Sequence, residues 1–451
     1  MWRARAGCLL FAALGCTRAR TAPVGPPDLA LVYVADLRGA VAAPPHAAGG
    51  LARRATSVDR LRLSARAVVQ VDAGDVAPSP EDEPGLVDAA AREARARLAL
   101  RAYRRMGVDA ITVGERDLAV GAAKWRALCD EAKVPVVAAN IVGADGKLIF
   151  PGQRIVHAGD TAVGVFGVFE MPPKEWTAPP GVAVGDPAVA ARTAVQSLRA
   201  QGARVVVGLF HVAGGRARAT EIAAAAGVDL VVLGHGGEPA PPRIVRAGFR
   251  GVDVGRVDVR VRDGGEPRLE DHVVPSTPDV AEQLGVRMLV RVAAGPITAT
   301  FAESVAAMKA AGISSYGENW SYGSTALCSG CHATQAAQWR TTDHAHAFAT
   351  LEKAGRSRDP ACMGCHFTGF LVPGGAQNLE SADQFRDVGC ETCHGPSVAH
   401  VTSTDKRKGT SRAVDPIVCL GCHTPDQNVG PFVVADGTKE IVGPGHGLPP
   451  R

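Results

Sequence analysis

Short apolar runs alternate with amphipathic stretches over the first 275 residues of the chain. The runs are rich in Val, Ile, Leu and Ala and cover residues 29–35, 67–71, 110–113, 134–138, 162–169, 204–210 and 228–233. Stretches with helical character lie between them, including residues 86–106, 122–133 and 187–201. Buried strands that alternate with helices are typical of α/β folds, and near-continuous apolar runs predict strands that are covered on both faces.

The pattern changes after residue 275. Residues 280–294 and 302–311 read as two helices separated by a Gly-Pro pair. Leu284, Met288 and Val292 recur at helical spacing in the first of them, which predicts a packed connector. Beyond residue 316 the chain consists of short connectors between repeats of one motif.

That motif is the pentapeptide Cys-x-x-Cys-His, which occurs four times between residues 328 and 423. Chance alone would produce about 0.008 copies in a chain with this content of Cys and His. The spacing suits covalent haem c attachment, because two thiols three positions apart can add to the vinyl groups of one porphyrin while the next imidazole binds the iron. The predicted attachment residues are Cys328, Cys331 and His332; Cys362, Cys365 and His366; Cys390, Cys393 and His394; and Cys419, Cys422 and His423.

Zinc binding is the alternative interpretation, because paired Cys-x-x-Cys units can form tetrahedral Cys₄ sites. Such sites need no His after the second Cys, whereas all four copies here have one. The motifs also use eight of the eleven cysteines in complete pairs, which indicates cofactor attachment and not a disulfide framework. We therefore expect four covalent haem c groups.

The connectors between successive motifs contain only 29, 23 and 24 residues. Segments of this length cannot bury separate globular cores. The sequence therefore predicts a mainly α-helical and irregular C-terminal domain in which closely packed haems form the core. Close packing of haems favours a role in electron transfer.

Four histidines outside the motifs are candidate distal iron ligands, namely His344, His346, His400 and His446. Residues 338–348 and 389–400, together with His446, resemble the multihaem cytochrome family that includes the hydroxylamine-linked tetrahaem electron carrier. The resemblance implies that His344, His400 and His446 are distal ligands and that one haem can remain five-coordinate. His346 could complete the fourth haem, but it lies two residues from His344, and the two imidazoles are expected to point differently.

Polar residues follow several of the predicted strands, at the edge where α/β sheets place their ligand sites. They are Asp36, Asp75, Glu115, His211 and His235. With the segments 50–55, 71–75, 106–114 and 137–140, they resemble the calcineurin-like metallophosphoesterases, in particular the N-terminal domain of bacterial 5′-nucleotidases. The resemblance covers residues 28–275 and implies a layered α/β fold with a two-metal site. The C-terminal nucleoside-binding domain of those enzymes has no counterpart in this chain.

Four roles of that metal site are lost. Arg38, Glu115, Arg116 and Gly237 stand where the family has His, Asn, His and His. The first metal position keeps only Asp36 and the bridging Asp75. The second keeps Asp75, His211 and His235, and Glu115 can supply an oxygen ligand, so one divalent metal could still bind there.

Arg38 would place fixed positive charge near the vacated first position, and Arg116 replaces the histidine that would stabilise the transition state in the family. An arginine can hold an anion, but it cannot generate a hydroxide nucleophile as a metal pair does. We therefore predict a degenerate, structural or anion-binding domain that is at most mononuclear. An active metal-dependent phosphoesterase with an appended cytochrome is the alternative.

The N-terminus has the layout of a secretory signal, with two early arginines, an apolar run from Ala6 to Gly15, and Cys16. Residues 13–16 resemble a bacterial lipobox, and ordinary cleavage near Ala19 is the alternative. Either prediction implies export to the periplasm or the cell envelope, with membrane contact only through a lipid anchor. The predicted segments are a signal at 1–16, an α/β domain at 28–275, a helical connector at 276–315 and a tetrahaem domain at 316–451.

With 49 basic and 45 acidic residues, the chain is nearly balanced, which argues against nucleic acid as its main partner. The basic cluster at residues 406–408 and Arg412 is either a solvated loop or a docking surface for an acidic redox partner protein. The sequence thus predicts an exported electron-transfer cytochrome. A haem oxidoreductase acting on a small nitrogen compound is a further alternative, and the oligomeric state stays open.

Overall fold

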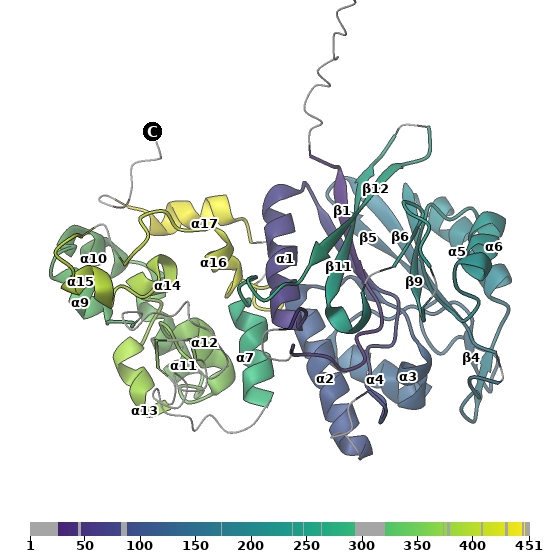
Figure 1. Cartoon of the computed structure of the whole chain (residues 1–451), viewed down its shortest axis with the longest axis horizontal. Helices are drawn as coiled ribbons and strands as arrows, with labels where there is room; N and C mark the ends of the chain where they lie inside the picture. The colour runs from purple at the N-terminus through teal and green to yellow at the C-terminus, as the bar shows by residue number, and fades with distance from the viewer. Residues whose placement is uncertain are drawn as a thin grey trace, which may run out of the picture.

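The structure is a computed structural model that describes most of the chain from Pro26 onward. The described ranges are 26–43, 47–82, 88–172, 174–236, 238–246, 248–262, 264–293, 321–372, 374–376, 379–406, 409–428, 432–443 and 446. The predicted signal and the predicted helix at 302–311 lie outside these ranges. The described residues form an N-terminal lobe (26–275) and a C-terminal lobe (321–446), with helix α7 (Leu284–Ala293) between them (Figure 1).

Two five-stranded sheets form the centre of the N-terminal lobe. The first has the order β12 (Arg268–Pro275), β11 (Asp253–Arg260), β1 (Leu29–Val34), β2 (Val68–Asp72) and β3 (Ala110–Ile111). The second has the order β10 (Ile244–Val245), β9 (Leu230–Gly234), β8 (Val205–Val212), β6 (Thr161–Glu170) and β5 (Gln153–Ala158). Strands β4 (Ile141–Gly143) and β7 (Val182–Val184) form a separate pair.

The sheets pack face to face, and helices cover their outer faces. Helices α1 (Leu51–Ser64), α2 (Ala89–Met106), α3 (Glu115–Ala119) and α4 (Ala122–Ala132) lie on one side, and α5 (Pro187–Ala200) and α6 (Gly215–Ala226) lie on the other (Figure 1). Alternation along β8 shows the layering, because Val207 and Leu209 face the other sheet while Val206 and Phe210 face α5 and α6. The prediction of strands covered on both faces is correct for this sheet.

Local sequence signals fix the ends of the longer helices. The Asp88 side chain accepts a hydrogen bond from the backbone N–H of Ala91 at the start of α2, and Gly107 ends that helix in the left-handed conformation. Asp186 caps α5 in the same way, directly before Pro187. These capping residues explain why the predicted boundaries of both helices lie within a few residues of the observed ones.

The sequence prediction differs from the observed sheets in several places. Residues 134–138 form no strand, since only Val136 pairs with Ile111 through a single bridge. Pro135, the neighbouring residue, has no backbone N–H to donate to a ladder. The prediction also misses β4, β5, β7, β10, β11 and β12. Of these, β11 pairs antiparallel with both β12 and β1, and β11 and β12 carry charged residues on alternate positions.

The C-terminal lobe consists of short helices and irregular segments, as predicted. The helices are α9 (Thr325–Ser329), α10 (Ala333–Trp339), α11 (Ala347–Lys353), α12 (Pro360–His366), α13 (Leu379–Ala382), α14 (Cys390–His394), α15 (Val398–Thr402), α16 (Ile417–Leu420) and α17 (Val434–Ile441). Short 3₁₀ turns occur at η1 (Phe249–Gly251) in the N-terminal lobe and at η2 (Asp343–His346) and η3 (Asp383–Phe385) here. No described helix in either lobe combines the length and apolar character needed to cross a bilayer.

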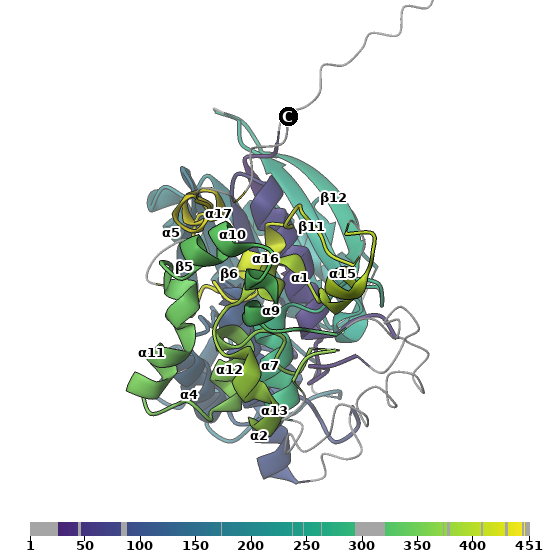
Figure 2. The same cartoon turned by 90° about the vertical axis from the view of Figure 1, so that its left-hand side faces the viewer.

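The C-terminal lobe also has an apolar core of its own, which corrects the expectation that haems alone would form it. Phe348, Met363, Phe367 and Phe370 are buried together in this core. Met288 of α7 is part of the same cluster, so the connector contributes to the core of this lobe. On its other side α7 packs against α1 and α2 of the N-terminal lobe (Figure 2).

Candidate functional site

The polar residues predicted at the strand ends converge on one edge of the two sheets. Asp36 follows β1, Asp75 follows β2, and both are almost fully buried. Asp36, Asp75 and His235 have φ values of 53°, 57° and 54°, in the left-handed region that non-glycine residues rarely adopt. Backbone strain of this kind tends to cluster at functional sites.

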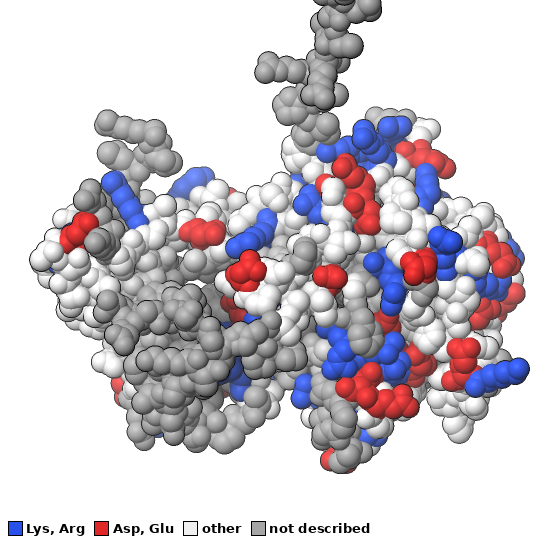
Figure 3. Space-filling model, in the orientation of Figure 1, with Lys and Arg blue, Asp and Glu red and all other residues white. Residues whose placement is uncertain are grey.

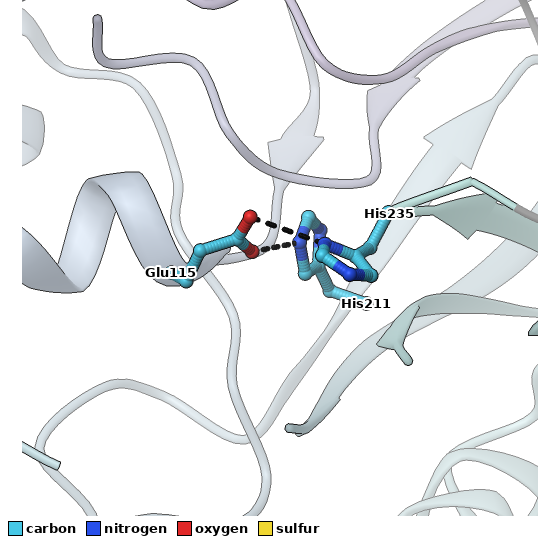
Figure 4. Close-up of side chains that lie close together, drawn as sticks. All are labelled: Glu115, His211 and His235. Carbon is cyan, nitrogen blue, oxygen red and sulfur yellow. Dashed lines mark hydrogen bonds and ion pairs between the residues drawn. The ribbon is translucent and has the colours of Figure 1, made fainter. Parts of the chain in front are cut away.

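Glu115, His211 and His235 form a compact hydrogen-bonded group (Figure 4). Glu115 opens α3, His211 lies in β8, and His235 directly follows β9. His211 Nε2 lies 2.6 Å from Glu115 Oε2, and His235 Nδ1 lies 3.1 Å from Glu115 Oε1. The other His211 nitrogen donates to the carbonyl of Ala73 at 2.8 Å. Both ring nitrogens of His211 therefore face acceptors, as in an imidazolium.

The charges of the group agree with this geometry. Burial opposes the protonation of His211, but the charge of Asp75 and the hydrogen bond to Glu115 outweigh it and raise the pKa of His211 to about 10. Burial also opposes ionisation of Glu115, yet its hydrogen bonds to His211 and His235 hold its pKa well below the usual range. Burial raises the pKa of Asp75 to about 6, although the His211 charge opposes the shift.

Arg116 and Arg38 lie beside the carboxylates of the site. Arg116 NH1 lies 2.7 Å from Asp75 Oδ2, and its Nε donates to Asp82 Oδ2 at 2.8 Å. Arg38 lies 3.5 Å from Asp36 Oδ1 and 4.0 Å from Asp75 Oδ2. The carboxylates that would bind a first metal are thus neutralised by guanidinium groups of the chain itself.

Close backbone packing fixes the geometry of this group. A Cβ atom on Gly114 would lie 2.1 Å from Asp75 Oδ1, and one on Gly234 would lie 2.6 Å from His211 Nδ1. Asp117, which is fully buried, accepts hydrogen bonds from the backbone of Gly114, Asp75 and Ala77. Only glycine at positions 114 and 234 lets these segments approach so closely.

Two other acidic residues contribute to the site, and the sequence analysis did not select them for it. Asp82 is the partner of Arg116 and also lies 3.9 Å from Arg38. Asp72 accepts from Tyr103 Oη at 2.5 Å and from the Gly74 backbone at 2.9 Å. Asp82 follows no predicted strand, so no pattern marks it. Asn140 turns out to be structural, because its side chain bonds the backbone of Phe169 and Gly185.

Two overlapping sets of side chains in this group could hold a metal ion. One consists of Glu115, His211 and His235, and the other of Asp36, Asp75 and His211, each with ligand atoms within 4.8 Å of one another. One carboxylate and two imidazoles suit a divalent transition metal. The second set is occupied by ion pairs with Arg38 and Arg116. The donor set therefore fits one metal better than two.

In the C-terminal lobe, the four motifs lie at or beside short helices. The second motif lies at the C-terminal end of α12 and the third forms α14, while the first ends just after α9 and the fourth begins in α16. The Cys328 and Cys390 thiols interact directly, and so do those of Cys365 and Cys422. Burial and, after it, the nearby Cys419 raise the pKa of the Cys393 thiol to about 11. The attachment sites are therefore adjacent in the order first, third, fourth, second.

Two candidate distal histidines lie close to proximal histidines. The ring centroids of His332 and His400 are 6.2 Å apart, and so are those of His344 and His423. Two imidazoles on opposite sides of one metal, each bonded at about 2 Å, would have centroids roughly 6 Å apart. The spacing in both pairs therefore fits one iron between two histidines.

His446 lies near His394, the proximal histidine of the third motif. The charge of His394 acts on His446 and, after burial, is the second cause that lowers the pKa of His446. The buried Nδ1 atoms of His400 and His446 have no hydrogen-bond partner among the described residues. Orphaned ring nitrogens in partly buried positions are consistent with side chains arranged around a cofactor.

The second motif differs from the other three. His366 Nδ1 donates to the carbonyl of Ala347 at 2.7 Å, which orients the imidazole. His346, the candidate for its distal ligand, is exposed, and its Nε2 lies 3.2 Å from the carbonyl of Arg340. The structure therefore does not bring His346 and His366 together as it does the other pairs.

Comparison with known proteins identifies the C-terminal lobe. Residues 327–395 match the family model described as cytochrome c554 and c-prime. The C-terminal lobe contains a cytochrome c554 domain. Cytochrome c-554 of Nitrosomonas europaea is 38% identical over 84 residues, and the match covers 15% of this chain and 36% of the relative. The chain thus spans about a third of that relative. A domain of this family implies covalently bound haem c.

The N-terminal lobe shares its fold with solved hydrolases. Sulfate thiohydrolase SoxB of Thermus thermophilus aligns with a TM-score of 0.51 and 19% identity, over 60% of this chain and 61% of that one. A 5′-nucleotidase precursor of the same organism aligns with a TM-score of 0.49 and 24% identity, over 59% of this chain and 58% of that one. The lobe has the metallophosphoesterase-like fold, so the predicted fusion and both predicted fold classes are confirmed.

Proposed function

We propose that the protein is an exported tetrahaem electron carrier whose N-terminal lobe is a degenerate phosphoesterase-like scaffold. The observation that carries the proposal is the pairing of candidate distal and proximal imidazoles at 6.2 Å. Two histidines on one iron leave it no open position, which favours electron transfer over catalysis. Bound haem would supply reversible one-electron chemistry.

The residues of the chain have separate tasks in this proposal. The paired thiols of each motif anchor a porphyrin, and the proximal imidazole holds the iron. His400, His344 and His446 complete the coordination of the haems at the first, fourth and third motifs, respectively. The carbonyl of Ala347 orients His366, and the same kind of contact orients His394, whose Nδ1 donates to the carbonyl of Ser411 at 2.7 Å.

Haem quantification tests the attachment directly. Intact mass and pyridine haemochrome should both give four haems for the exported protein. Electron paramagnetic resonance should show three low-spin haems, and His344→Ala should remove one low-spin signal. His346→Ala, a matched change two residues away, should leave all signals intact. Zinc without haem, or an unchanged spectrum in His344→Ala, would overturn the proposal.

The second motif supports a second candidate function. No histidine in the described part of the chain faces His366 as His344 faces His423. An iron with an open position can bind a small molecule, so this haem is the place where a small nitrogen compound would react. Nitric oxide should change the spectrum of one haem only. Lack of any change would exclude this second function.

The N-terminal lobe is not a two-metal phosphatase in this proposal. Arg116 and Arg38 neutralise the carboxylates of the first position, and neither can activate water as a metal pair does. Nitrophenyl phosphates and nucleotides should not be turned over with added manganese or zinc. Turnover that disappears in Asp75→Asn or His211→Ala would instead support an active hydrolase.

Export and partner choice are further parts of the proposal. The N-terminal charge pattern and the haem motifs both support export, and a lipid on Cys16 would tether the protein to the envelope. Mass spectrometry of the mature N-terminus distinguishes lipidation from simple cleavage.

The partners in this proposal are other redox proteins. Residues 407 and 408 of the basic cluster lie outside the described ranges.

A further inference from the structure

A cavity of about 610 Å³ lies between the two lobes. Cofactor-sized ligands commonly occupy pockets of about 300–1,000 Å³. The C-terminal lobe lines this cavity with attachment residues of two motifs: His366, Cys362 and Cys365 of the second, and His423 and Cys422 of the fourth. His344, which faces His423, also lines it. The cavity therefore adjoins the places where two haems attach.

The opposite wall of the cavity belongs to the N-terminal lobe and is cationic. Arg101, Arg104 and Arg105 lie on one face of α2, at helical spacing, and Lys133 ends α4. Arg104 and Arg105 are half-buried, whereas Arg101 and Lys133 are exposed. Figure 1 shows α2 and α4 in the N-terminal lobe, with α2 next to α7.

The acidic residues around the cavity already have partners. Asp426 accepts from Arg105 Nε at 3.0 Å, and Glu131 pairs with Arg97. Arg356, a cation on the C-terminal side, donates to Asp359 at 2.6 Å. These pairs leave no lining carboxylate for the remaining cations of the N-terminal wall.

Three of those cations are uncompensated. Within the described ranges, Arg101, Arg104 and Lys133 make no ion pair. They face a wall that carries the thiols and imidazoles of two haem attachment sites. Haem carries two propionate carboxylates, and arginine binds a carboxylate through two parallel N–H donors.

We propose that Arg101, Arg104 and Lys133 bind the propionates of the haems attached at the second and fourth motifs. The phosphoesterase-like lobe thereby completes a haem environment that the C-terminal lobe forms only in part. This explains how a lobe with neutralised metal positions contributes to a cytochrome. The inference rests on the haem attachment proposed above, which the haem count of the wild-type protein tests separately.

Binding of this kind has an electrochemical consequence. Reduction adds negative charge to a haem, and nearby cations stabilise that charge. Loss of the cations should therefore lower the reduction potentials of the two haems concerned. The haems at the first and third motifs, whose attachment residues do not line the cavity, should keep theirs.

The experiment compares variants of the full-length, haem-loaded protein by potentiometric titration, with paramagnetic resonance of poised samples to separate the haems. Arg101→Gln/Arg104→Gln/Lys133→Gln should shift two potentials downward and leave the others unchanged. Arg101→Lys/Arg104→Lys keeps the positive charge, so both potentials should stay close to their wild-type values. Arg192→Gln, an exposed change on the distant helix α5, is the matched control and should shift none.

Two results would overturn the inference. One is an unchanged set of potentials in the triple variant, and the other is an equal shift of all haems, which a general change in surface charge would cause. Arg101→Gln/Lys133→Gln alters exposed side chains only and so keeps the test valid if the triple variant folds poorly. It should give a smaller shift of the same two potentials.

Discussion

The His211–Glu115 pair makes stability depend on pH at the scale of single residues. The fold raises the pKa of His211 from 6.5 to about 10, since Asp75 and Glu115 together outweigh the effect of burial. A raised pKa stabilises the folded state below pH 6.5, and this contribution is lost as the pH rises towards about 10. The contribution of His211 to the stability of the metal-free lobe is therefore largest below pH 6.5.

We predict that the free energy of unfolding of metal-free protein falls between pH 6.5 and about 10, and that Glu115→Gln reduces this slope. Chemical denaturation in the presence of a chelator measures both. His157→Asn alters an exposed histidine and should leave the slope unchanged. Equal slopes in wild-type protein and Glu115→Gln would mean that Glu115 does not raise the pKa of His211.

Arg116 is a second single residue with a testable role: its guanidinium supplies the positive charge that a metal ion would supply beside Asp75. Its guanidinium contacts the buried Asp75, while its own side chain is 15% exposed. Breaking a buried pair costs about 3–5 kcal/mol and an exposed pair about 0–1 kcal/mol, so Arg116→Ala should cost about 2 kcal/mol.

Manganese or zinc should recover part of that loss in Arg116→Ala, because a cation can replace the missing charge beside Asp75. It should stabilise the wild-type protein less. Denaturation with a chelator and with added metal compares the two. Arg126→Ala removes an exposed arginine that lies 3.7 Å from Asp130, and it should change little in either condition. If metal stabilised Arg116→Ala and the wild-type protein equally, Arg116 would not be a replacement for the charge of a metal ion.

At the scale of elements, the helices and strands that could be predicted were those marked by local sequence patterns. Apolar runs and capping residues predicted β1, β6, β8, α2 and α5. The antiparallel strand β12 was not predictable in this way, because its pairing with β11 depends on a partner and not on its own charged sequence. Asp82 joined the site through tertiary contacts with Arg116, which no local pattern encodes.

Helix α7 packs closely against the second and fourth Cys-x-x-Cys-His motifs. A Cβ on Gly364, inside the second motif, would lie 2.4 Å from Cγ of Met288, which is buried in α7. Gly285 of α7 donates its backbone N–H to the carbonyl of Gly421 in the fourth motif at 3.1 Å. Glycine at position 364 therefore allows the second motif to approach α7 closely.

Gly364→Ala should destabilise the C-terminal lobe by about 1–3 kcal/mol, as overpacking of a filled core does. Gly330→Ala is the matched control at the equivalent position of the first motif, where an added Cβ would meet only the Leu327 carbonyl at 3.8 Å. It should be neutral or slightly stabilising, because alanine favours helical backbone. Chemical denaturation followed by haem absorbance compares them, and equal losses would contradict the packing argument.

At the scale of the whole molecule, the lobes differ in surface but share an interface. On the face in Figure 3, charged side chains are dense over the N-terminal lobe and sparse over the described surface of the C-terminal lobe. Hydrogen bonds link the two across α7: Gln283 Nε2 donates to the carbonyl of Leu420 at 2.9 Å, and Arg105 donates to Asp426. We expect these contacts, of which the first is buried and the second partly buried, to couple the stability of the lobes.

Gln283 lies at the centre of this coupling. It is 7% exposed, its backbone N–H donates to the carbonyl of Ala52, and its side-chain oxygen accepts from Val286. Gln283→Ala leaves the Leu420 carbonyl without this partner and should cost about 1–3 kcal/mol. Because the lost bond spans the lobes, the variant should also make their unfolding less cooperative.

In the wild-type protein, far-ultraviolet circular dichroism and haem absorbance should report one coincident transition. The two probes should separate in Gln283→Ala. Gln153→Ala removes a hydrogen bond from Gln153 to Ser197 at 2.7 Å within the N-terminal lobe. This control should lower stability while keeping the probes coincident, since it leaves the contacts across α7 intact. Coincident probes in Gln283→Ala would mean that α7 joins the lobes without coupling them.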